Sequence, residues 1–109
     1  MAGSDLFTGS LDLLILKALS WGPQHGYAIG RWIRQTTAEA LTIQEGALYP
    51  ALHRLERRGF LDEEWGTSET GREAKFYRLS RAGQAQLKSE AARWRQYVRV
   101  MSIALNSRA

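Results

Sequence analysis

The chain has 109 residues, enough for one domain, and 44% of them are hydrophobic, which supports a real core and argues against disorder. The absence of cysteine excludes disulfides and thiolate metal sites, and the longest apolar run, Leu13 to Leu16, is far shorter than the ~20 residues of a membrane span. The N-terminus has no basic residue and does not resemble a signal peptide, so we expect a cytoplasmic protein with no membrane partner. The net charge of +4 is carried by residues 82–109, so by itself it is weak support for DNA binding.

The first predicted helix covers Leu11 to Leu19. Ser10 is its expected N-cap, and Trp21-Gly22-Pro23 ends it because proline cannot continue a helix. Apolar residues occupy nearly all sides of this short helix, which indicates a place at the centre of the core or in an interface. We assign Leu11 and Leu14 to a candidate interface with a second chain.

Two more helices follow, from about Gln24 to Thr37 and from about Gly46 to Arg58. Thr42 and Ile43, between them, are candidates for a short extended piece. The later helix carries an apolar stripe with i, i+4, i+7 spacing, made of Leu48, Leu52 and Leu55. Gly59 is expected just past its C-terminus, where a residue with positive φ is favoured.

Two strand candidates, residues 60–65 and 74–79, flank a polar segment bounded by glycines, which predicts a β-hairpin. Ser80 is the expected cap of a long helix from Arg81 to Leu105. The predicted fold is therefore mostly α with a small β-hairpin. It consists of a winged helix-turn-helix DNA-binding domain over residues 1–80 and a C-terminal dimerisation helix over residues 81–109.

The helix from Gly46 to Arg58 has a second face, on which Tyr49, His53 and Arg57 recur at i, i+4, i+8. These side chains are suited to phosphate contacts and to hydrogen bonds with base edges, so we predict that the helix enters the major groove of double-stranded DNA. The predicted DNA-binding set also includes neighbours of this face and two basic residues of the wing: Gln44, Tyr49, Pro50, His53, Arg54, Arg57, Arg72 and Lys75. A basic helix face is often only solvated surface, and it is the hairpin that favours DNA contact.

In the long helix, apolar residues are spaced 4, 3, 4, 3, 4 as the a and d positions of a heptad seam: Leu87, Ala91, Trp94, Val98, Met101 and Leu105. About 25 helical residues span ~37 Å, whereas the domain core is only ~25 Å across. The distal half should therefore project and require a partner surface. We predict a homodimer, whose two-fold axis would present two recognition helices to a palindromic operator. The alternative is a monomer in which the helix folds back over its own core.

Three motifs suggest a family. The segment Gly46–Gly59 resembles the recognition helix of the PadR (phenolic acid decarboxylase regulator) family, and His25-Gly26-Tyr27 resembles the start of that family's second helix. The segment Lys75–Ser80, followed by Ala82-Gly83, is similar to its second wing strand and the entry to its last helix. The likeness covers about residues 9–105 and is to the compact subgroup with a single C-terminal helix.

The resemblance implies a dimeric regulator, usually a repressor, that is released from its operator by a small molecule or a stress signal. In some members of the compact subgroup a flat aromatic compound binds at the dimer interface and stacks on an aromatic residue of the last helix. By this resemblance the candidate effector-binding residues are Trp94, Val98, Leu13 and Leu14. A tryptophan at a heptad position can instead pack against its mate in the second chain.

Two other hypotheses remain open. The wing carries Glu69 and Glu73 against Arg72, whereas family wings are commonly more basic, so the chain could be a winged-helix module that binds a protein in place of DNA. An enzyme is the third hypothesis. The sequence has no recognisable nucleophile–histidine–acid set, glycine-rich phosphate loop or metal-ligand spacing, so we assign no catalytic residue, no metal site and no cofactor.

Overall fold

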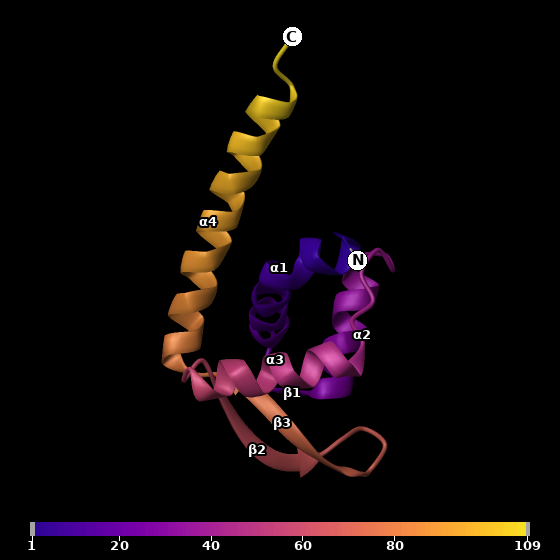
Figure 1. The fold of residues 1–109 in the computed structure, drawn as a ribbon. Helices are drawn as coiled ribbons and strands as arrows, with labels where there is room; N and C mark the ends of the chain where they lie inside the picture. Colours follow the sequence, from indigo (N-terminus) through magenta and orange to yellow (C-terminus); the bar gives the residue numbers. More distant parts are fainter. Residues whose placement is uncertain (1, 109) are drawn as a thin grey trace.

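The computed structural model describes the backbone of residues 2–108 and the side chains of residues 10–108. Its elements follow the chain as α1 (Ala2–Leu19), β1 (Gln24–His25), α2 (Gly26–Thr36), α3 (Glu45–Arg57), β2 (Leu61–Thr67), β3 (Glu73–Leu79) and α4 (Arg81–Leu105). Figure 1 shows α3 lying between the other short helices and the sheet, while α4 runs away from both. The predicted fold class, mostly α with a winged helix-turn-helix and a long last helix, is confirmed.

Helix α1 begins at Ala2, so the prediction that Ser10 caps its start is wrong. Gly9 and Ser10 are poor helix formers, but together they cost only about 1.5 kcal/mol relative to alanine, which is a weak preference. Further along the helix, Ile15 and Leu16 are fully buried, and tertiary packing of that kind readily outweighs propensity. The nearly all-apolar sequence of α1 thus reflects its place at the centre of the core.

The sheet has three antiparallel strands in the order β1-β3-β2, one more than the predicted hairpin. The additional strand, Gln24–His25, pairs with Tyr77 and Phe76 of β3. The prediction that these two residues begin the second helix is wrong. Instead His25 is extended, and its Nδ1 accepts a hydrogen bond from the N–H of Ala28 at 3.2 Å, so this side chain caps α2 from outside.

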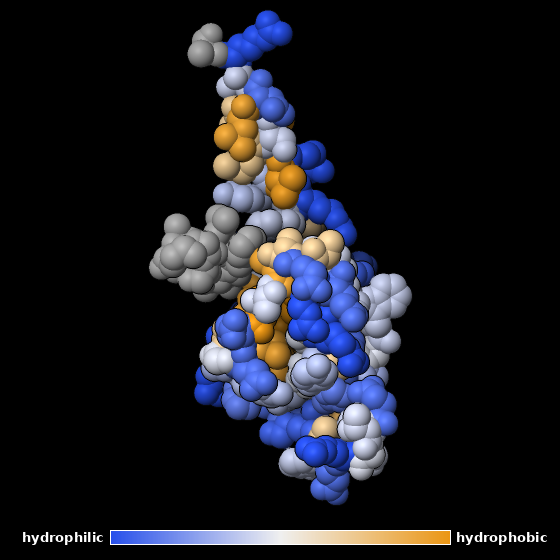
Figure 2. Space-filling model, turned by 90° about the vertical axis from the view of Figure 1, so that its right-hand side faces the viewer, coloured by the Kyte–Doolittle hydropathy of each residue, from blue (hydrophilic) through white to orange (hydrophobic). Residues whose placement is uncertain are grey.

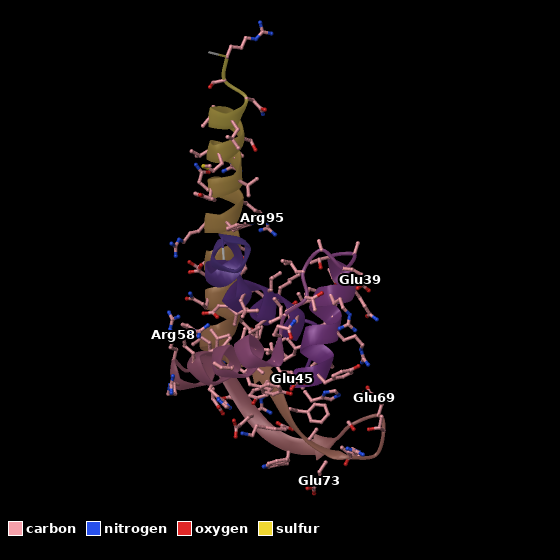
Figure 3. All side chains as sticks on the ribbon, turned by 45° about the vertical axis from the view of Figure 1, so that its right-hand side comes forward. Glu39, Glu45, Arg58, Glu69, Glu73 and Arg95 are labelled. Atoms are coloured by element: carbon pink, nitrogen blue, oxygen red, sulfur yellow. The ribbon has the colours of Figure 1, made fainter. Side chains whose placement is uncertain are left out.

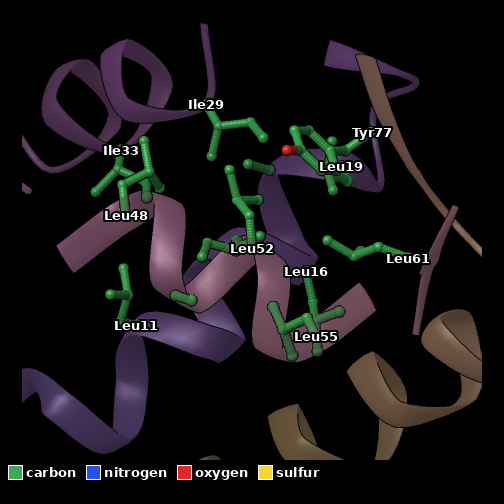
Figure 4. Close-up of a cluster of buried hydrophobic side chains, with 13 residues drawn as sticks. Leu11, Leu16, Leu19, Ile29, Ile33, Leu48, Leu52, Leu55, Leu61 and Tyr77 are labelled. Carbon is green, nitrogen blue, oxygen red and sulfur yellow. The ribbon is translucent and has the colours of Figure 1, made fainter. Parts of the chain in front are cut away.

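One hydrophobic core joins the first three helices to the sheet (Figure 4). Its buried members are Leu11, Ile15, Leu16, Ala18, Leu19, Ile29, Ile33, Leu48, Ala51, Leu52, Leu55, Leu61 and Tyr77. The predicted leucine stripe of α3 is therefore confirmed as its inward face. Ile43, expected in a short strand, lies in an irregular loop and packs partly against this core. Because the core holds one face of α3, the opposite face has a fixed outward direction.

The corner between α3 and α4 is tied by short hydrogen bonds. Gly59 has a φ of 83°, and its N–H donates to the carbonyl of Glu56 at 3.0 Å, as expected for a residue just past a helix. The Ser80 hydroxyl accepts from the N–H of Gly83 at 3.0 Å and donates to the carbonyl of Gly59 at 2.6 Å. The predicted Ser80 cap is thus confirmed, and it fixes the direction in which α4 leaves the domain.

Helix α4 projects from the domain, and the molecule measures 58 × 28 × 22 Å along its principal axes. Leu87, near its start, packs against the core, whereas every residue from Ala92 to Leu105 is exposed. The alternative in which this helix folds back over its own core is therefore wrong. Figure 2 shows hydrophobic side chains gathered on the projecting half of α4.

Candidate nucleic-acid interface

The outer face of α3 carries the predicted recognition residues. Tyr49, His53 and Arg57 are exposed, as the helical spacing predicts for the side opposite the buried leucines. Pro50 is exposed beside them, in the second turn, where its missing N–H removes only one helical hydrogen bond. Gln44 is the N-cap residue of α3, but its side chain forms no capping hydrogen bond and is exposed. The structure thus brings these residues together along one outward edge.

The ring of Tyr49 rests on the start of α2. A Cβ added at Gly26 would lie 2.7 Å from both Cε1 and Oη of Tyr49, well inside contact distance. Only glycine therefore lets the tyrosine occupy this position. The His25-Gly26-Tyr27 motif and the recognition helix, noted separately in the sequence, meet here.

Gly26→Ala is expected to weaken DNA binding about tenfold, which corresponds to losing the hydrogen bond that the Tyr49 hydroxyl would donate to a DNA phosphate. The added methyl displaces the flexible end of Tyr49 and leaves the backbone in place, so thermal stability should change little. The measurement is a titration with a bound duplex, alongside a thermal melt. Gly30→Ala, one turn further along α2, is the matched control because its Cβ would lie 3.6 Å from Leu48 Cδ2, an ordinary contact. Equal affinities for the two variants would contradict this role of Gly26.

Arg54 turns away from the recognition edge. Its Nη2 donates to Oδ1 of Asp12 on α1 at 2.6 Å, and the guanidinium is only half exposed. The ion pair fastens α3 to α1. Of the predicted DNA-binding residues on α3, Arg54 therefore lies at the margin of the edge, already partnered within the chain.

Acidic residues border the wing side of the edge. Lys75 Nζ lies 3.2 Å from Glu63 Oε1, and the hydrogen bond to this carboxylate raises the pKa of Lys75, keeping it protonated. Glu63 also shares a hydrogen bond with Glu56 of α3, which raises the pKa of Glu56 and lowers that of Glu63. Lys75 thus serves first to neutralise a carboxylate pair between wing and helix. Arg72 is exposed in the loop between β2 and β3.

Two residues near the edge were not predicted. Tyr27 is exposed on the first turn of α2, and the guanidinium of Arg31 lies over its ring, 5.4 Å from the centroid. The i, i+4 spacing of an aromatic and an arginine was a signal for such a pair. Because α2 carries the glycine under Tyr49, this cation–π pair adds positive charge beside the predicted site.

The surplus positive charge lies elsewhere. Figure 3 shows Arg95 on α4, well away from α3 and from the wing residues Glu69 and Glu73. As expected from the sequence, the net charge does not mark the candidate site.

The residues predicted for the dimer interface fall into two groups, one packed in or against the chain's own core and one exposed to solvent. Leu11 is buried in the chain's own core, and Leu14 and Leu87 pack partly against it. The distal members of the predicted seam are all exposed: Trp94, Val98, Met101 and Leu105. Ala91 is half-buried between the two groups. The surface left open for a partner therefore lies mainly on α4 beyond Ala91.

An open hollow of about 860 Å³ lies between α1 and the middle of α4. Its lining includes Ser10, Leu13, Trp94, Tyr97 and Val100. Of the predicted effector residues, Leu13 and Trp94 line it, whereas Leu14 and Val98 are not among the described lining residues. Tyr97, whose ring centroid lies 5.8 Å from that of Trp94, was not predicted for this role.

The described residues contain neither a membrane-spanning helix nor a cluster of metal-ligating side chains. Across residues 2–108 no helix is long and apolar enough to cross a membrane. Among the side chains of residues 10–108, no group of three or more His, Cys, Asp or Glu is placed to hold a metal ion.

The fold is that of a winged helix-turn-helix protein of the DNA-binding type. Its third helix has a leucine stripe facing the core and an outward edge, and an antiparallel hairpin follows directly. The model of the PadR-like family of transcriptional regulators matches residues 15–89, and the chain belongs to this family, as its motifs suggested.

Solved structures agree with this assignment. The chain is 33% identical to a transcriptional regulator from Clostridium thermocellum, with a TM-score of 0.82 and coverage of 91% of this chain and 93% of that one. It is 27% identical to a PadR family transcriptional regulator from Eggerthella lenta, with a TM-score of 0.83 and coverage of 98% and 91%. A protein of Lysinibacillus sphaericus is 28% identical over 103 residues, 94% of each chain.

Proposed function

We propose that this chain is a dimeric, sequence-specific DNA-binding repressor, released from its operator by a small molecule or a stress signal. The observation that carries the proposal is the outward edge of Tyr49, His53 and Arg57 on a helix whose other face is locked in the core. Hydroxyl, imidazole and guanidinium groups on one rigid edge match the phosphate and base-edge groups of a major groove.

The projecting half of α4 supports the dimer. Its seam leaves large apolar side chains in water, each worth about 1.5–3 kcal/mol when buried. A second α4 would cover this surface and pair two recognition helices for a palindromic operator. In this proposal residues 1–80 bind DNA and residues 81–109 join the two chains.

The hollow beside Trp94 supports a small-molecule effector. The hollow is open on one side, and its mostly apolar lining includes the rings of Trp94 and Tyr97, which suits a flat aromatic compound. Because the hollow adjoins the proposed dimer surface, a ligand there would bias how the two chains are held. The direct experiment screens flat aromatic compounds for release of a bound duplex and repeats any positive result with Trp94→Ala.

The function is tested through Arg57. Arg57→Ala should lower affinity for a duplex selected from a random pool by at least tenfold. It should also reduce the slope of log affinity against log salt by about one, because one phosphate-neutralising charge is lost. Arg58→Ala is the matched control: the neighbouring guanidinium is also exposed but lies over the Phe60 ring, 4.9 Å from its centroid.

An equal effect of the two substitutions would count against this edge as the DNA-reading surface. A wild-type chain that recovers no duplex from the pool, while pulling down a protein, would favour the alternative of a protein-interaction module. The observation behind that alternative is the acidic wing, where Glu69 and Glu73 stand against Arg72.

A further inference from the structure

Trp65 is an exposed aromatic residue on the wing that the predicted site does not include. It lies in β2, opposite Lys75 of β3, and 68% of its surface is exposed. An apolar side chain of this size forgoes a large burial energy in water, which contact with a partner would recover.

The face of the hairpin that carries Trp65 is the face that turns toward α3. Side chains alternate along a strand, so Trp65 shares its face with Glu63 and Leu61. Leu61 is buried in the core, and Glu63 reaches Glu56 of α3. Trp65 is next in this row, just beyond the core, so it extends the surface that begins with the exposed edge of α3.

The acidic residues of the wing are largely partnered within the chain. Glu63 pairs with Lys75, Asp62 and Glu64 both pair with Arg78, and Glu69 at the loop lies 3.3 Å from Nε2 of His25. The lysine and arginine pairs offset part of the charge that would repel a phosphate backbone. Residues 61–79 still carry five acidic against three basic side chains, so the wing keeps a net charge of −2, and a large uncharged side chain on the face toward α3 is the contact with DNA that this charge does not oppose.

We propose that Trp65 is the principal DNA contact of the wing, packing against sugars and base edges in the groove next to the one that α3 enters. The inference rests on the proposed DNA-binding function and adds a contact to it. An indole is rigid, largely apolar and carries one N–H donor, so it gains from leaving water against a deoxyribose and loses little conformational freedom. Because the contact is uncharged, it adds affinity without adding to the salt dependence.

The test uses the full chain, a duplex selected from a random pool and a second duplex of scrambled sequence. Trp65→Ala should weaken binding to the selected duplex about tenfold or more and leave the slope against salt unchanged. Trp65→Phe should retain most of the affinity but lose the change in tryptophan emission that the wild type shows on binding. Trp21→Ala is the matched control, since Trp21 is 72% exposed but lies in the turn after α1, with Lys17 over its ring.

The outcomes separate this inference from the function on which it rests. If the wild type binds and Trp65→Ala binds with the same affinity, the wing contact alone is overturned. The same holds if Trp21→Ala loses as much affinity as Trp65→Ala. Failure of the wild type to bind any duplex overturns the proposed function and the contact with it. Equal melting temperatures of wild type and Trp65→Ala show that the variant is folded. If it is not, Trp65→Phe and its emission decide the question.

Discussion

Gly83→Ala is expected to destabilise the chain by about 3 kcal/mol, although alanine is the better helix former by about 1 kcal/mol. Gly83 is buried in the first turn of α4, where a Cβ would lie 2.0 Å from the carbonyl oxygen of Phe60. That oxygen already accepts a hydrogen bond from the N–H of Ser80 at 3.1 Å, so it cannot rotate away without breaking this bond. The added methyl must therefore displace the start of α4 from the segment that links α3 to β2.

Urea denaturation at equal protein concentration measures this effect, because a dimer's stability depends on concentration. Gly46→Ala, in the first turn of α3, is the control, since its Cβ would meet no described atom within 4 Å. That substitution should be neutral or stabilise by up to about 1 kcal/mol. Two variants of similar stability would mean that the corner relaxes freely and that α4 is not rigidly placed.

Local patterns predicted the elements that set the fold. The leucine stripe of α3, the glycine after it and the serine before α4 each depend on neighbours a few residues apart, and all three lie where the sequence put them. The strand Gln24–His25 was missed because two residues are too few for a periodicity to register. Its only signal is the pairing with β3, about fifty residues further on in the sequence.

The candidate site shows the same division. Helical spacing sufficed to place Tyr49, His53 and Arg57 on one edge. It could not show that Arg54 is held by Asp12, because those residues are 42 positions apart and meet only through the packing of α1 on α3. The ion-pair partners of the wing carboxylates could not be predicted for the same reason. The sequence alone therefore suggests stronger repulsion between the wing and DNA than the structure does.

Val98→Glu is expected to convert the protein to single chains at micromolar concentration. Val98 lies midway along the projecting half of α4 and is 45% exposed in one chain. If a second α4 covers Val98, the substitution places two carboxylates near the two-fold axis. Each chain then loses the apolar contact of its valine, and each new carboxylate loses its hydration. At about 3 kcal/mol per copy, the dimer dissociation constant should rise by about four orders of magnitude.

Sedimentation velocity measures the fraction of dimer. Gln96→Glu is the control that separates the effect of a charge inside the interface from the effect of added charge in general. Gln96 adds the same charge two residues away but, by helical periodicity, on the other side of α4. In DNA titrations, Val98→Glu should lose about a hundredfold or more on a duplex with two half-sites, because the link between the recognition helices is gone. It should keep wild-type affinity per chain on a single half-site, since α3 and the wing are untouched. A variant that still sediments as a dimer and binds the full duplex normally would show that something other than a second α4 covers this seam.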